Sequence, residues 1–248
     1  GKNGSHIGGA LSLAEVFAVL YGGEVSVDPL HPEEGNRDRV IVSKGHCVLS
    51  YYAALNKSGF ITDIMLDEFE TNGSLLHGHA TRNLPFGIEF SGGSLGMGMS
   101  FAIGIALAGK INHREYHVYV IVGDGECNEG MVWEAFMSAS HFKLDNLTVI
   151  IDHNRLQYDG CLSSVMDMGS LKTKLEAFGF YAVEVDGHQV TELHQALQTH
   201  IPDMPIAVIA DTIKGKGVSF MENKREWHHS VLSRDQYELA MSEQFYKQ

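Results

Sequence analysis

The stretch that decides the fold is Val118-Tyr-Val-Ile-Val-Gly-Asp-Gly-Glu-Cys-Asn-Glu-Gly130, and Leu147-Thr-Val-Ile-Ile-Asp-His-Asn-Arg-Leu156 follows it. Each stretch begins with five residues that are mostly apolar and β-branched, and then reaches Gly, Asp or Asn. That pattern is typical of a buried strand in a parallel sheet. The residues between them, Met131–Phe142, have the composition of a helix. Together they predict a strand–helix–strand unit.

The same alternation continues on both sides of this unit. Further strands are predicted at Arg39–Ser43, Tyr181–Val185 and Ile206–Ala210, and further helices at Ala10–Tyr21, Val48–Ser58, Leu95–Lys110, Leu171–Phe178 and Val190–His200. Alternating strands and helices predict an α/β fold with a parallel β-sheet flanked by helices on both faces. No linker divides the chain, so residues 1–248 are expected to form a single domain. A last helix is expected over Arg234–Lys247.

The composition of the chain disfavours some classes of binding partner. The net charge is −13 with a pI near 5.4, and no basic stripe is present, which disfavours binding to nucleic acid. No apolar run approaches the ~18–20 residues that are needed to cross a bilayer. The three cysteines, at 47, 127 and 161, are not spaced as a metal finger, and their odd number favours a reducing cytoplasm.

The ends of the two quoted strands carry oxygen ligands for a divalent metal. Asp124 follows the first strand, between glycines 123 and 125 that let the backbone approach a phosphate or adopt positive φ. Asn154 comes 30 residues later, after one helix and one strand, and so returns to the same edge of a parallel sheet. The Asp124 carboxylate, the Asn154 amide oxygen and the Leu156 carbonyl are the hard ligands that Mg²⁺ or Ca²⁺ prefers. The next helix would attract an anion to its N-terminus.

Two other interpretations of this motif are weaker. Gly-Asp-Gly by itself also fits an ordinary turn at the end of a strand, and only the strand context and Asn154 favour a diphosphate site. A dinucleotide site would need Gly-x-Gly-x-x-Gly at the opening of the first helix, and the sequence has none there.

The motif resembles that of thiamine diphosphate enzymes, and the chain as a whole resembles the N-terminal half of transketolases. Five segments match in order: residues 4–9, residues 37–46, Gly78-His79 with residues 92–98, the metal motif ending at Asp152–Leu156, and residues 212–217 with Trp227-His228. Departures from the family pattern are Ile7, Ala80, Tyr158 and His229. They affect the substrate side, and so imply an unusual sugar such as a branched, deoxy or sulfonated ketose.

The resemblance implies roles for particular side chains. His6 and His228 resemble residues that handle the hydroxyl proton of the acceptor, and His79 resembles the residue that holds the C1 hydroxyl of the donor. Glu129, with Glu134, resembles glutamates that link two active sites at a subunit interface, although both also fit ordinary partners of a helix dipole.

The residues expected to bind the cofactor surround the metal motif. The segment Ser94-Leu95-Gly96 resembles the family's shelf beneath the thiazolium ring, and Ser94 also fits the N-cap of a helix. The complete expected set is Lys44, His46, Gly93, Ser94, Leu95, Gly123, Asp124, Gly125, Glu126, Asn154, Leu156, Lys214 and His228.

The implied activity is transfer of a two-carbon ketol unit from a ketose, expected to be phosphorylated, to an aldose, with thiamine diphosphate and Mg²⁺ (or Ca²⁺ or Mn²⁺). The family binds the aminopyrimidine through a second half that this sequence lacks. We therefore expect a split enzyme in which a second, C-terminal subunit completes an α2β2 assembly. The alternative is a fragment of a longer chain, and the start at Gly1 suggests a missing upstream segment.

Three other functions stay open at this point. The same metal motif occurs in 1-deoxyxylulose-phosphate-synthase-like enzymes and in enzymes that act on 2-oxoacids. His79 and the segment from Lys214 to His228 favour transketolase over both. A catalytically silent structural subunit is the third possibility, and the intact metal motif argues against it.

Overall fold

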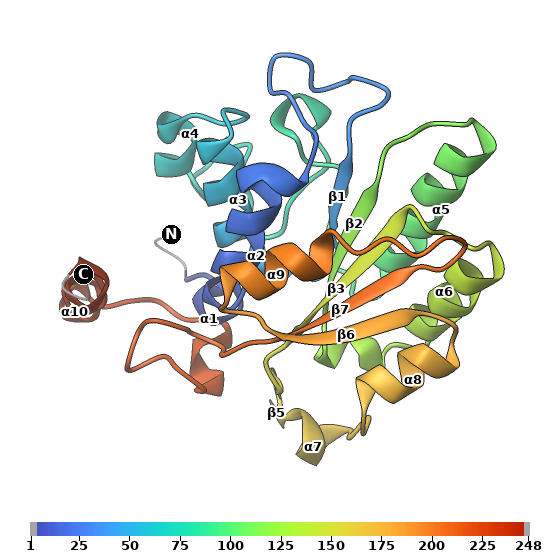
Figure 1. Cartoon of the computed structure of the whole chain (residues 1–248). Coiled ribbons are helices and arrows are strands. Elements are labelled where there is room, and N and C mark those ends of the chain that lie inside the picture. The colour runs from blue at the N-terminus through green and yellow to red at the C-terminus, as the bar shows by residue number, and fades with distance from the viewer. Residues whose placement is uncertain (1–3, 246–248) are drawn as a thin grey trace.

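Five parallel strands form the central sheet of the structure, a computed structural model that describes residues 4–245 (Figure 1). Their spatial order is β1-β2-β3-β7-β6. Their bounds are β1 Arg39–Val42, β2 Val118–Gly123, β3 Leu147–His153, β6 Tyr181–Asp186 and β7 Ile206–Asp211. Each strand begins at the predicted residue and ends within one residue of the prediction. The predicted α/β fold with a parallel sheet is confirmed.

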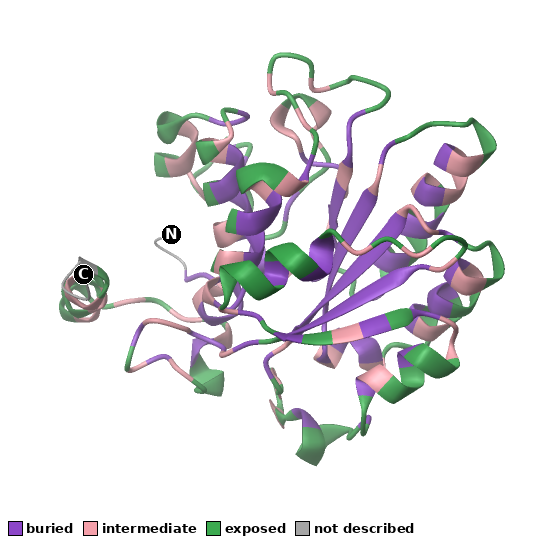
Figure 2. Ribbon diagram, in the orientation of Figure 1, coloured by how far each residue is buried: buried purple, intermediate pink, exposed green. Residues whose placement is uncertain are grey.

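Helices cover both faces of the sheet; β1, β2, β3 and β7 are almost entirely buried, whereas the edge strand β6 mixes buried and exposed residues (Figure 2). One face packs against α2 Ala14–Val19, α3 Val48–Lys57 and α9 Val190–Leu197; the other packs against α5 Met97–Ile111, α6 Gly130–His141 and α8 Leu171–Ala177. Successive side chains of a strand alternate between the faces, so Val40 joins the first core and Ile41 the second. The two cores explain why these strands read as continuous apolar runs.

The prediction of one helix over Ala10–Tyr21 is wrong. The chain forms α1 Ile7–Leu11 and then α2, and a π-helical turn follows at Leu20–Glu24. Leu13 leaves helical geometry between α1 and α2, with φ −113° and ψ 10°. At this break the Ser12 hydroxyl lies 2.7 Å from Asp152 Oδ2, a contact that no local sequence pattern encodes.

The remaining elements differ from the prediction by a few residues at their ends, or were not predicted. Helix α5 begins two residues after the expected Leu95, and α9 ends three residues before the expected His200. Elements that were not predicted are α4 Asp63–Asp67, α7 Leu162–Val165 and the hairpin of β4 Leu156–Gln157 with β5 Gly160–Cys161. Helix α10 spans Arg234–Phe245, whereas Lys247 of the expected helix lies outside the described residues.

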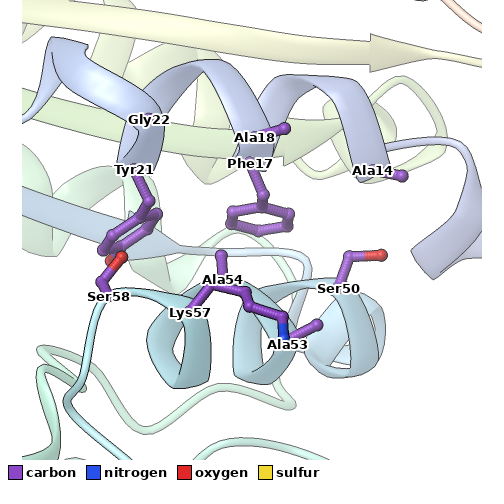
Figure 3. A pocket seen from close by; sticks show the side chains of 10 residues that line it. All are labelled: Ala14, Phe17, Ala18, Tyr21, Gly22, Ser50, Ala53, Ala54, Lys57 and Ser58. Atoms are coloured by element: carbon purple, nitrogen blue, oxygen red, sulfur yellow. The ribbon is translucent and has the colours of Figure 1, made fainter.

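An apolar cavity of about 460 Å³ lies between α2 and α3 (Figure 3). Phe17 and Tyr21 from the helical segment line it together with Ala53 and Ala54 from α3. Among the described residues, Lys57 is the one lining residue that is charged at neutral pH, and the other polar side chains are hydroxyls of Tyr21, Ser50 and Ser58. Within residues 4–245, no helix is long and apolar enough to cross a membrane.

Candidate cofactor and substrate site

A polar cavity of about 330 Å³ opens at the carboxyl ends of the central strands. Four of its segments follow β1, β2, β3 and β7 directly, as expected for a ligand site in a parallel α/β sheet. The lining residues are His6, Lys44, His46, His79, Gly93, Leu95, Gly123, Asp124, Gly125, Glu126, Asn154, Leu156, Gln157, Tyr158, Asp159, Lys214 and His228. The structure thus brings together residues that lie as much as 222 positions apart, from His6 to His228.

Three of the residues named from the sequence, Ser94, Glu129 and Glu134, do not line this cavity. Ser94 is exposed and caps no helix, because α5 begins after Gly96, whose left-handed φ of 84° makes it the N-cap instead. Glu129 is exposed at the N-cap of α6, and Glu134 is exposed one turn later. A Cβ placed on Gly96 would lie 3.2 Å from Glu129 Cβ, so the two loops are adjacent.

The three expected metal ligands lie at neighbouring strand ends. Gly123 of β2 pairs in register with Asp152 of β3, which sets Asp124 beside the segment that carries Asn154. The Asp124 carboxylate accepts hydrogen bonds from the Gly125 and Arg155 amides, at 2.7 and 2.5 Å. Asn154 Oδ1 accepts one from the Leu156 amide at 3.0 Å.

The glycines of the motif matter because they have no side chain, and not because they adopt unusual backbone angles. Neither Gly123 nor Gly125 has positive φ, so that part of the expectation is wrong. A Cβ on Gly125 would lie 3.0 Å from the Gln157 side chain, which leaves little room for any larger residue. The metal loop and the β4–β5 hairpin can therefore approach each other closely.

The donor set fits a hard divalent cation. It consists of a carboxylate, an amide oxygen and a backbone carbonyl, which are the ligands of Mg²⁺ and Ca²⁺. The Lys214 ammonium donates to the Leu156 carbonyl at 3.0 Å, so a positive charge already lies against one of these oxygens. Within the described part of the chain, no group of three or more His, Cys, Asp and Glu side chains is arranged to hold a metal.

Burial shifts the pKa values of the charged groups in and beneath the cavity. Burial, and then the charge of Asp152, raise the pKa of Asp124 to about 6. Lys44 and Asp152 form an ion pair with side chains 1% and 0% exposed. Burial alone would lower the pKa of Lys44, but the Asp152 carboxylate outweighs it, and the net shift of that pKa is upward. Burial, with the Lys44 charge second, lowers the pKa of Lys214 to about 8.

Four histidines converge on the other side of the cavity. The His6 ring centroid lies 5.6 Å from that of His46, 5.2 Å from that of His79 and 5.3 Å from that of His228. Burial, and then the neighbouring His229, lower the pKa of His6 to about 4; burial and Lys214 lower that of His228 to about 3. Both rings are therefore neutral near pH 7, and each can donate one hydrogen bond and accept another.

Glu126 differs from its expected role as a cofactor contact. Its carboxylate points into the protein, where it accepts hydrogen bonds from the Ser43 hydroxyl and from the amides of Gly96 and Gly123, the latter at 2.7 and 3.1 Å. It joins the end of β1, the start of α5 and the metal loop. Glu126 is nevertheless one of the residues that line the cavity.

The sequence interpretation missed several residues of the site. Gln157 and Asp159 line the cavity, and so does Tyr158, which the sequence marked only as a departure from the family pattern. All three lie on the β4–β5 hairpin, which is too short to produce a strand pattern. Asp152 lies beneath the cavity and is fully buried. An acidic residue within a buried apolar strand is rare unless it is paired, and this was the signal available for it.

Comparisons with known proteins agree with this geometry. The family model described as transketolase, thiamine diphosphate binding domain, matches residues 1–246. A protein of Phocaeicola vulgatus that is named as one of the subunits of apulose-4-phosphate transketolase is 42% identical over 240 residues, which are 96% of this chain and 85% of that protein. The 6-deoxy-6-sulfo-D-fructose transketolase subunit SqwG of a Clostridium species is 38% identical over 246 residues, which cover 98% and 90%.

A solved structure gives the same result for the fold. The transketolase of Campylobacter jejuni superposes with a TM-score of 0.89 at 28% identity, over 97% of this chain and 39% of that one. The resemblance predicted from the five sequence segments is confirmed. The chain belongs to the transketolase family, as its thiamine diphosphate-binding domain.

Proposed function

We propose that this chain is the diphosphate- and metal-binding subunit of a two-subunit transketolase, and that residues 1–248 act as one domain. It transfers a two-carbon ketol unit from a ketose to an aldose with thiamine diphosphate and Mg²⁺. The observation that carries this proposal is the cavity itself, where metal-type oxygens, two lysines and four histidines converge. Relatives of similar length that are named as transketolase subunits support the division into two chains.

The cofactor end of the cavity is the side with the strand ends. Asp124, Asn154 and the Leu156 carbonyl would bind the metal, with Mn²⁺ or Ca²⁺ as substitutes for Mg²⁺. Lys44 and Lys214 carry the positive charge that faces a diphosphate. The backbone of Gly123, Gly125 and Glu126 would surround its oxygens, and the segment Gly93–Leu95 would lie under the thiazolium ring. His46, whose pKa is lowered by burial and then by Lys44, contributes a neutral donor.

The substrate end is the histidine cluster. Thiamine diphosphate, when bound, supplies the nucleophilic carbon that accepts and releases the two-carbon unit. His6 and His228 are neutral near pH 7 and can take a proton from a hydroxyl or return one. His79 lies 5.2 Å from His6, centroid to centroid, and is placed to hold a hydroxyl of the donor.

The substrate is proposed to be a ketose that carries an anionic group. One relative is named for a ketose phosphate and another for a sulfonated fructose. The cations that line the cavity, Lys44 and Lys214, lie on the proposed diphosphate side, and no arginine among the described residues lines it. We therefore assign recognition of the anionic tail to the second subunit. Exposed Glu129, beside Gly96, is proposed to contact a neighbouring subunit in an α2β2 assembly. The three free cysteines favour the cytoplasm.

The test is reconstitution with a candidate second subunit. The purified chain is assayed alone and in the pair, on ketose phosphates, on a sulfonated ketose and on pyruvate, with an aldose acceptor. We expect ketol transfer from the pair and none from the chain alone. Robust transfer by the chain alone would end the two-subunit proposal. Use of pyruvate in place of ketoses would replace transketolase with the 2-oxoacid alternative, and no turnover with any partner would favour a silent subunit.

A further inference from the structure

Asp152 lies outside the cavity, yet its carboxylate connects most of the segments that build it. The side chain is fully buried. Its two oxygens meet donors from four separate segments: Ser12 between α1 and α2, Lys44 after β1, Asn154 after β3 and Thr212 after β7. Three of the four donors converge on Oδ2, and the Thr212 hydroxyl donates to Oδ1.

The contact with Asn154 decides which atom of its amide faces the metal site. Asn154 Nδ2 donates to Asp152 Oδ2 at 2.9 Å, and Asn154 Oδ1 accepts from the Leu156 amide at 3.0 Å. A flipped amide would turn its oxygen toward the carboxylate and its NH₂ toward the Leu156 N–H. Both contacts would then be repulsive, because each would pair two acceptors or two donors.

The orientation leaves a lone pair of Asn154 Oδ1 free for a cation. An amide oxygen has two lone pairs, and the Leu156 amide uses one. Nitrogen of an amide side chain is not a ligand for a hard cation, so a flipped Asn154 would be lost from the donor set. The same carboxylate also binds Lys44, and the Asp152 carbonyl accepts from the Asp124 amide at 3.1 Å.

From these contacts we infer that Asp152 is a positioning residue for the metal site, acting through Asn154. The inference rests on the proposed function, because it requires that Asn154 bind a metal. Removal of a partner that orients a metal ligand typically weakens metal affinity by about 10- to 100-fold. An effect of that size, transmitted through Asn154 alone, is what distinguishes positioning from general support of the fold.

The test is a double-mutant cycle on Mn²⁺ binding. Free Mn²⁺ is measured by electron paramagnetic resonance at a fixed concentration of thiamine diphosphate for the wild type, Asp152→Asn, Asn154→Ala and the double variant. We expect Asp152→Asn to weaken Mn²⁺ binding at least about 10-fold. In the Asn154→Ala background the same change should cost less than about twofold, because the residue it positions is already gone. A purely structural role would instead give losses that multiply.

Asp186→Asn is the matched control. Asp186 ends β6, two strands away from β3 in the sheet, and its exposed carboxylate accepts from the His188 amide, a contact that an asparagine side chain can keep. This variant should bind Mn²⁺ as the wild type does. Equal binding by wild type and Asp152→Asn, or equal losses from Asp152→Asn in both backgrounds, would overturn the inference.

A second arm protects the test against misfolding. If circular dichroism shows that Asp152→Asn is unfolded, the change is combined with Lys44→Met, which removes both buried charges together. The cost of Asn154→Ala is then compared between the wild type and this pair. We expect a large loss in the wild type and less than about a twofold loss in the pair; equal losses would reject the inference.

The cycle also separates this inference from the proposed function. Asp124→Asn is measured in parallel as a direct ligand variant. If wild-type Mn²⁺ binding is absent or does not depend on Asp124, the metal site itself is wrong and the role of Asp152 falls with it. If Asp124→Asn abolishes binding while Asp152→Asn leaves it intact, only the inference about Asp152 fails.

Discussion

Two polar cavities lie along the same edge of the same sheet, and they differ in the burial of their charges. The candidate site at the ends of β1, β2, β3 and β7 encloses about 330 Å³, whereas a cavity at the ends of β6 and β7 encloses about 850 Å³. The larger cavity is lined by carboxylates, imidazoles, an arginine and a lysine. One of its ion pairs, Arg155 with Asp211, has side chains 57% and 51% exposed, against 1% and 0% for Lys44 and Asp152.

Enclosure by neighbouring segments explains the difference more than strand order does, because exposed Arg155 itself follows the end of β3 by two residues. Strand β3 is the middle strand of the sheet and β6 is an edge strand. The segment after β3 is enclosed by α1, by the end of β1 and by the 3₁₀ turn Arg225–His228, whereas the end of β6 faces solvent. Water screens charges in the open cavity, so they interact weakly. Burial with complementary pairing of charges, rather than cavity size or the number of charged groups, sets the candidate site apart from the larger cavity.

The largest expected contrast is between the two ion pairs. Lys44→Met leaves the Asp152 carboxylate buried without its cation, and we expect it to reduce the free energy of unfolding by about 3–5 kcal/mol. Arg155→Met removes the exposed pair and should cost about 0–1 kcal/mol. Urea unfolding of the two variants and the wild type measures both losses. Similar losses would show that burial does not separate the two regions.

The second contrast compares the Asp124 carboxylate, in the candidate site, with the Asp211 carboxylate, beside the larger cavity. Asp124→Asn should weaken metal-dependent binding of thiamine diphosphate by at least about 10-fold, or about 1.4 kcal/mol, because a ligand charge is lost. Asp211→Asn, beside the larger cavity, should leave the affinity unchanged. Isothermal titration calorimetry with Mg²⁺ gives both values. Unchanged binding by Asp124→Asn would remove that residue from the site.

The smallest contrast concerns pH and two histidines with lowered pKa values. Burial lowers the pKa of His228 to about 3 and that of His117, outside the cavity, to about 4, from 6.5 in the unfolded chain. As pH falls, these histidines take up protons in the unfolded chain before they do so in the folded protein. Their contribution to the free energy of unfolding is therefore fully present above pH 6.5, and it is lost as pH falls toward 4 for His117 and toward 3 for His228. Asp124 acts in the opposite sense, because its raised pKa favours the folded state at low pH.

Substitution separates these two histidines. Both His228→Asn and His117→Asn should flatten the fall of the melting temperature between pH 7.5 and 5. Only His228→Asn should also reduce ketol transfer by the reconstituted pair. The effect on stability is expected to be smaller than those above, since His228 is only partly buried. A melting curve whose pH dependence is unaltered by His228→Asn would contradict the assignment of a neutral ring.

The local sequence pattern was enough to predict the strands and the polar residues at their ends. A run such as Val118–Val122 is apolar throughout because helices cover both faces of the sheet, so the sequence alone predicts a buried parallel strand. Consecutive parallel strands end at the same edge, which is why strand direction alone assigns Asp124 and Asn154 to one site. The histidines required more, since the chain has 14 and only family resemblance selected four of them.

Other features were decided only when distant segments met. The helix expected over Ala10–Tyr21 breaks near Ser12, whose hydroxyl lies beside Asp152, 140 residues away. Ser94 has the chemistry of a cap, but the left-handed Gly96 starts α5 instead. The inward carboxylate of Glu126 was equally invisible to a local pattern.

The sequence by itself determined the parallel α/β fold, the metal-type oxygens at Asp124 and Asn154, and the family. Those features depend on local periodicity and on strand direction, which neighbouring residues encode. Tertiary structure alone decided which charges are buried, which donors surround Asp152 and which of two polar cavities is shielded from water. Burial and hydrogen-bond partners depend on segments remote in the chain, and these set the pKa values and the side-chain orientations that the chemistry requires.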